Sequence, residues 1–242
     1  MNSERTIVMF ALIVAAVSLA AAFVAADPTA PVSTALQSSS SRDLSGLPAQ
    51  TVDARGGNVT QINIEALTIT KAWQGYYGQV SGEITLDDAS SNTFYNWSMT
   101  SVGGEVYATR ASSITWTNVN CTNATNVTAE QTYLGQVTAD GDSVTNTFSL
   151  TTHPAFNVST SQIFADTCRS THGFANNASQ SQNWTQVLLT DWTGGHIIYT
   201  TILNDTAVGF DGGTYDFQLL VGENEHTGSI GVTQYYFWVE LN

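Results

Sequence analysis

The sequence predicts an all-β protein. The preferred architecture is a β-sandwich of the immunoglobulin-like or jelly-roll-like kind, and a β-barrel is the alternative. Short windows rich in Thr, Val, Ile and aromatic residues recur along the chain, and such residues suit a pleated, half-buried surface. Turns rich in Gly and Asp separate the windows, and strands do not alternate with helices as they would around a parallel sheet.

The predicted strands follow one another at short spacing behind residue 58. The first, over 61–65, alternates apolar and polar residues, as a strand with one buried face does. Further windows of similar composition lie at 82–88, 93–99, 105–109, 113–117, 144–150, 186–189, 196–203, 215–221 and 234–241. Glycine can take the positive φ of tight hairpins, and it occurs in the turn signals 103–104, 140–142, 194–195 and 211–213.

Helical patterns are weak behind the N-terminal segment. Residues 129–134 predict one short helix near Cys121. The stretch 121–182 is poor in strand signals, so we expect much of it to form excursions on one side of the sandwich.

An apolar run over residues 7–26 begins the chain, with Arg5 before it and Ser18 as its only polar member. The residues Val24-Ala25-Ala26 before Asp27 fit the small-x-small cleavage site of a signal peptide. An uncleaved anchor is the alternative, because about twenty residues of helix span the roughly 30 Å of a bilayer core. Both alternatives export the rest of the chain, which predicts an extracellular or cell-surface protein.

Three parts follow from this organisation. Residues 1–26 are a signal peptide or membrane anchor, and residues 58–242 are the β-sandwich domain. Residues 27–57 are rich in Ser, Pro and Gly and lack periodicity, which predicts a flexible polar linker.

The charge composition disfavours two classes of partner. Six Lys and Arg face 20 Asp and Glu, giving a formal net charge of −14. A nucleic-acid groove needs clustered cations, which the sequence lacks, and an anionic lipid surface is disfavoured for the same reason. Contact with a membrane is therefore expected only through residues 7–26, if they stay uncleaved.

The two cysteines, Cys121 and Cys168, predict a disulfide, because disulfides persist in exported proteins. Two buried thiols or intermolecular bridges are the alternatives.

Nine Asn-x-Ser/Thr sequons also follow the export segment, where about four would arise by chance. We expect covalent N-glycans at several of them: Asn58, Asn96, Asn120, Asn123, Asn126, Asn157, Asn177, Asn183 and Asn204. Asn120 ranks lowest, since it directly precedes Cys121.

Several short sequence motifs resemble those of a known protein family. They lie at 73–89, 104–108, 153–156, 198–201, 209–218 and 235–241. Together they resemble a family of exported archaeal proteins that has no assigned activity, over roughly residues 68–242. The resemblance implies an archaeal cell-surface or secreted β domain, and it supplies no catalytic residue.

Candidate chemical sites are weak. His153, His172, His196 and His226 lack the spacing of a zinc site, which needs three or four convergent ligands. Aspartates at the turns 87–88, 140–142 and 211 could hold one structural calcium, although such residues usually bond their own backbone. No nucleophile–base motif is present, so we expect no enzyme activity and no cofactor. The aromatic runs 73–77 and 235–238 suit carbohydrate stacking, but core packing is the stronger interpretation.

Two hypotheses lead, and an exported hydrolase trails as a third. The first is a non-catalytic, glycosylated structural protein of the cell surface, the subunit of an extracellular filament, appendage or coat. The second is a tethered binding module for glycans or a neighbouring surface protein. Self-association is expected through β-strand edges, whose unpaired backbone groups template pairing. The segment 58–64 could add to a neighbour's sheet, although pairing within its own sandwich is the favoured expectation.

Overall fold

The computed structural model describes residues 27–42, 44, 48–99, 101–224 and 232–242. It confirms the all-β class, since antiparallel strands dominate and helices are few. The main sheet has six strands, in the order β14 (Tyr236–Leu241), β4 (Gly104–Thr109), β10 (His196–Ile202), β9 (Ser179–Asp191) and β5 (Val119–Cys121), with β8 (Ser170–Ala175) also paired to β9.

The central strands of this sheet are buried on both faces. Along β10, Ile197 and Tyr199 belong to one apolar cluster and Ile198 to the other. Successive side chains of a strand point to opposite faces, so a near-continuous run of apolar and Thr residues serves both clusters. This explains why the composition of 196–203 and 186–189 identified the two central strands correctly.

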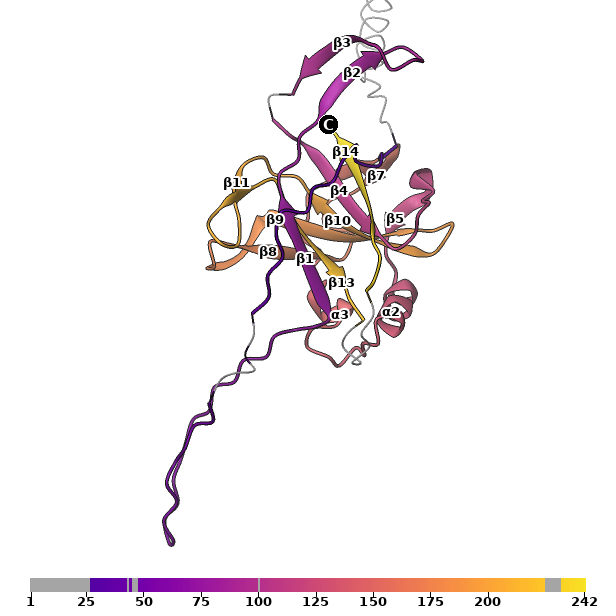
Figure 1. Ribbon diagram of the computed structural model, residues 1–242. Helices are drawn as coiled ribbons and strands as arrows, with labels where there is room; N and C mark the ends of the chain where they lie inside the picture. Colours follow the sequence, from indigo (N-terminus) through magenta and orange to yellow (C-terminus); the bar gives the residue numbers. More distant parts are fainter. Residues whose placement is uncertain (1–26, 43, 45–47, 100, 225–231) are drawn as a thin grey trace, which may run out of the picture.

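A second layer covers one face of the main sheet. It consists of β1 (Trp73–Gly78) paired with β13 (Phe217–Gly222), seen in front of β9 and β10 in Figure 1. Leu219 and Val221 of β13 pack into the cluster that contains Tyr199. Two helices, α2 (Ala124–Tyr133) and α3 (Val144–Thr147), add Val127 and Val144 to the same cluster.

The opposite face is covered by residues 114–119 and 156–168. The 3₁₀ turn η1 (Trp116–Asn118) and the hairpin of β6 (Phe156–Val158) and β7 (Ser161–Ile163) place Trp116, Phe156 and Ile163 in the second cluster. Two further hairpins lie outside these layers: β11 (Ala207–Val208) with β12 (Thr214–Tyr215), and β2 (Glu83–Asp87) with β3 (Thr93–Ser98).

Three strand predictions were wrong. Residues 144–150 begin helix α3, because the Ser143 side chain caps it by accepting a hydrogen bond from the Asn146 amide. Residues 113–117 lead into η1 instead of pairing. Residues 61–65 form no strand and are exposed. The stretch 121–182 contains more strands than predicted, namely β6, β7 and β8. The short helix predicted near Cys121 is confirmed as α2.

The region predicted as a linker contains one docked strip. Thr29 and Val239 exchange two backbone hydrogen bonds, of 2.9 and 2.8 Å, so Thr29 pairs with the outer edge of β14. The described residues from 33 to 71 are almost all exposed and contain no strand. Figure 1 shows this stretch leaving the body and doubling back as a long extended arm. It rejoins the body at Ala72, which is buried and whose carbonyl accepts from the Glu223 amide at 2.8 Å.

Candidate interaction surface

An exposed segment with a strand-like pattern lies on the returning half of the arm. Ile62 and Ile64 alternate with polar residues, and their side chains are 52% and 81% exposed. Leu67 and Ile69 continue the apolar pattern and are exposed as well. A strand of this composition gains stability only by pairing and burial. Within the described chain, the segment pairs with no strand, so its backbone groups and its apolar side chains are both available to a partner.

The hairpin β2–β3 presents a second apolar surface. Ile84 lies opposite Trp97 and Leu86 lies opposite Tyr95, so the four side chains share one face. Each is about half exposed, between 47% and 56%, and the Tyr95 and Trp97 rings lie 4.8 Å apart. Figure 1 shows the hairpin projecting beyond the main sheet. The opposite face carries the Asn96 sequon, so a glycan there would leave the apolar face uncovered.

The sequons lie where glycans can be accommodated, since none of their asparagines is buried. Asn123, Asn126 and Asn204 are partly buried. The others are exposed: Asn58, Asn96, Asn120, Asn157, Asn177 and Asn183. Asn123 has a second role, because its side chain accepts the Asn126 amide at 2.8 Å and caps α2. Asn120 lies on β5, the last strand at one edge of the main sheet.

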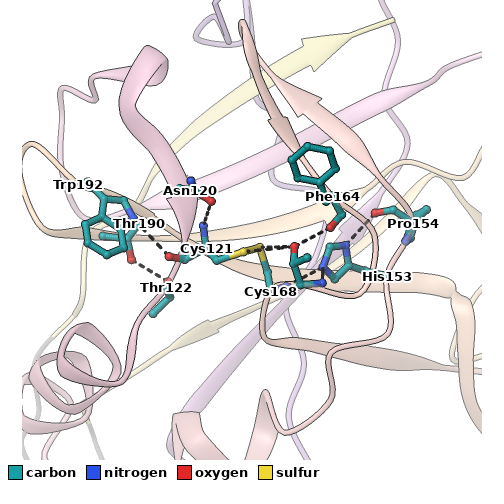
Figure 2. Close-up of a disulfide and its surroundings, with 10 residues drawn as sticks. Asn120, Cys121, Thr122, His153, Pro154, Phe164, Cys168, Thr190 and Trp192 are labelled. Atoms are coloured by element: carbon teal, nitrogen blue, oxygen red, sulfur yellow. Dashed lines mark hydrogen bonds between the residues drawn. A yellow bond between two sulfur atoms is a disulfide. The ribbon is translucent and has the colours of Figure 1, made fainter.

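The predicted disulfide is present between Cys121 and Cys168, with a Cα–Cα distance of 4.9 Å (Figure 2). It fastens β5 to the loop that leads into β8. His153 lies beside it, and its Nε2 accepts from the Cys168 and Thr167 amides at 2.9 and 3.2 Å. Its Nδ1 lies 2.8 Å from the Pro154 carbonyl and donates to it in the same tautomer. His153 therefore organises the disulfide loop.

A pocket of about 260 Å³ lies between α2 and the adjoining ends of β4 and β10. Arg110 and Glu130 line it and form an ion pair, and the guanidinium lies 3.5 Å from the centre of the Tyr133 ring. The Tyr199 hydroxyl donates to Glu130 at 3.0 Å. Burial, and then Glu130, raise the pKa of Tyr199 well above 10, so it stays protonated. Because Arg110 and Tyr199 both bond Glu130, the arrangement is suited to stabilising the fold. Its wall also includes His196.

Two of the aspartates considered for calcium, Asp88 and Asp211, bond their own turns, and Asp142 accepts from the Thr70 hydroxyl. Asp88 accepts the Ser90 and Asn92 amides at 2.8 Å, and Asp211 accepts the Gly213 amide at 2.9 Å. The Asn92 side-chain amide, at 2.8 Å, and then these backbone amides lower the pKa of Asp88, and the Gly213 amide lowers that of Asp211. No group of three or more His, Cys, Asp or Glu suited to a metal ion occurs among the described residues. His172 bonds Thr185 at 3.2 Å, and His226 lies outside the described residues.

The aromatic runs pack mostly into the body. Trp73 and Tyr235 contact the cluster around Tyr199, and Trp238 packs on Trp116 at 5.6 Å between ring centroids. Tyr77 is 44% exposed, but its ring contacts two aromatic neighbours. These contacts agree with the core-packing interpretation of both runs.

No protein-family model, curated protein or solved structure matches this chain. Among the described residues, no helix has the length and apolar character needed to span a bilayer. The apolar run 7–26 lies outside the described residues.

Proposed function

We propose that this protein is a non-catalytic, glycosylated structural protein of the cell surface, the subunit of an extracellular filament, appendage or coat. Its subunits would associate when the segment 58–69 of one copy adds as a strand to a sheet of the next. The observation that carries this proposal is the segment itself, which has the alternation of a strand and no partner within the described chain.

Strand addition suits the energetics of the segment. Main-chain hydrogen bonds to an open sheet edge would supply affinity, and the alternating apolar side chains would supply register. In a homopolymer each copy is both donor and acceptor, so a head-to-tail contact extends without closing. The edges of the body offer unpaired backbone groups, since the pairing on the outer side of β14 involves Thr29 alone among the described residues.

Other features support an exported structural role. The disulfide is typical of oxidising compartments, and the surface sequons suit glycans that keep a sparsely charged protein soluble. We further propose that β1 and β13 facing the main sheet represent a reduced β-sandwich, and that the resemblance to exported archaeal proteins reflects common ancestry.

The test is a paired substitution in the full chain. Ile62→Asp with Ile64→Asp places charge on the apolar side of the segment, and we expect polymers seen by electron microscopy and sedimentation to disappear. Gln61→Asp with Asn63→Asp adds the same charge on the other side and should leave polymers intact. Native material that is monomeric, or polymers that both variants retain, would contradict the proposal.

A second candidate function is a tethered binding module, and the apolar face of β2–β3 favours it. Exposed Tyr95 and Trp97 rings can stack on sugars or pack on a neighbouring surface protein. Trp97→Ala should then abolish retention on immobilised surface glycans or on cell-envelope protein while leaving the melting temperature unchanged. If the variant binds both as the parent does, this candidate fails.

A further inference from the structure

A buried pair of glutamates lies at one end of the main sheet. Glu105 of β4 is directly opposite Glu240 of β14 in the antiparallel register, so both side chains project from the same face. They are only 2% and 7% exposed. The Tyr107 hydroxyl donates to Glu240 Oε2 at 3.0 Å, and the Ser159 amide donates to both Glu240 oxygens at 3.1 Å.

The pair is left without a cation. Glu105 Oε2 is buried and has no hydrogen-bond partner among the described residues. Within the same described ranges, the ion pair present joins Arg110 to Glu130, so no side-chain cation contacts either glutamate. Besides each other, the groups that act on the pair are the Ser159 amide, the Tyr107 hydroxyl and the further carboxylate of Asp27. Burial, and then the charge of Glu240, raise the pKa of Glu105 to about 8.

The strip 27–29 leads directly to this pair. The Ser159 hydroxyl donates to Asp27 Oδ1 at 2.5 Å, while its amide donates to Glu240. Pro28 is buried, and Thr29 pairs with Val239, the residue before Glu240. Ser159 lies in the turn between β6 and β7, where it has a positive φ of 53°. Asp27 is exposed and lies beside Glu240, because Ser159 bonds both residues, and Glu105 lies behind Glu240.

We propose that the chain is cleaved between Ala26 and Asp27, and that the α-ammonium group released at Asp27 is the cation that this glutamate pair lacks. A signal peptidase would hydrolyse the peptide bond with one water, leaving a carboxylate on Ala26 and an amine on Asp27. That amine is protonated near neutral pH, whereas the amide nitrogen of an uncleaved chain carries no charge. Removal of residues 1–26 would then supply a positive charge to the buried glutamate pair, whether or not subunits polymerise.

The first measurement locates the mature N-terminus. The full chain is expressed with its export segment in a secreting host, and the exported protein is analysed by N-terminal peptide mass spectrometry. Asp27 is the expected first residue. A different first residue, or an exported chain that retains residues 1–26, would overturn the proposal.

The second measurement tests the ion pair through amine reactivity. The sequence has one lysine, Lys71, which is exposed, so acetic anhydride has two amines to modify and peptide mass spectrometry separates them. An amine paired with buried carboxylates holds its proton, and one unit of pKa corresponds to a tenfold change in the reactive fraction. We therefore expect the Asp27 amine to react about tenfold faster in Glu105→Gln than in the parent, with Lys71 unchanged.

Matched variants complete the design. Glu83→Gln removes an exposed carboxylate from the β2–β3 hairpin and should leave both rates as in the parent. Glu240→Gln should accelerate the Asp27 amine as Glu105→Gln does, and it provides a second reading if one variant folds poorly. Equal Asp27 rates in the parent and both core variants would overturn the ion pair.

Discussion

At the scale of single residues, two adjacent positions at the start of β4, Gly104 and Glu105, have unusual structural requirements. Gly104 has a φ of +118°, and a Cβ added there would lie 2.0 Å from the Glu240 carbonyl oxygen. Glu105 follows and lies buried against Glu240. Glycine is required at the first position because only it tolerates both the conformation and the close approach of β14.

Gly104→Ala should therefore destabilise the fold strongly. We expect a loss of roughly 3 kcal/mol or more in the free energy of unfolding, from backbone strain added to a clash with main-chain atoms. Urea denaturation measures it. Gly141→Ala is the control, because a Cβ there meets nothing within 4 Å, and a similar loss in both variants would contradict the explanation.

Glu105 predicts a pH dependence of stability. Where the Asp27 nitrogen carries no charge, the pKa of Glu105 in the folded chain is about 8, above the ordinary 4.5, so the folded state holds a proton that the unfolded state releases between these values. Stability should then fall as pH rises from about 4.5 through 8, most steeply in protein whose Asp27 amine has been acetylated. Glu105→Gln should flatten the profile of melting temperature against pH. An unchanged slope in Glu105→Gln would contradict this prediction.

At the scale of elements, local composition identified the strands that are buried on both faces. It failed where one side chain changed the local balance, as Ser143 does by capping α3. It also failed for 61–65, because alternation reports a preference for pairing and cannot supply the partner strand. The glutamate pair was missed because Glu105 and Glu240 meet only through the order of the sheet. A signal did exist, since each is an acidic residue within an apolar strand window.

Helix α2 allows capping to be separated from glycosylation. Asn123 is both its N-cap and a sequon asparagine. Asn123→Ala removes both functions and should cost about 1 kcal/mol of stability, whereas Asn123→Asp keeps a capping oxygen and removes only the sequon. Thermal unfolding of the two variants, compared with the parent, measures the difference. Equal melting temperatures for Ala and Asp would show that the cap contributes nothing.

At the scale of the whole molecule, the disulfide ties one edge of the main sheet to a loop 47 residues along the chain. In the chain-entropy model, closing such a loop disfavours the unfolded state by about 4 kcal/mol. Replacing Cys121 and Cys168 together by Ser should lower the melting temperature by roughly ten degrees. Calorimetry measures the shift, and the parent treated with reductant should shift similarly. A drop of only one or two degrees would contradict the estimate.

Glycans should add mass to the exported protein. The sequon asparagines are exposed or partly buried, so we expect several of them to be occupied. Intact mass spectrometry of native protein before and after enzymatic or chemical deglycosylation measures this. A native mass equal to that of the bare polypeptide would exclude the prediction.

The arm that carries the segment 58–69 is held at both of its ends, at Thr29 on β14 and at Ala72 before β1. It is therefore a closed loop, and any strand it lends to a neighbour stays joined to the donor by two chains. Residue 58 precedes Ala72 by 14 positions, so the segment reaches at most roughly 48 Å from that anchorage when fully extended. That length limits how far from its own body a subunit can lend the segment, and tension on the assembly would be shared between two anchorages in each copy.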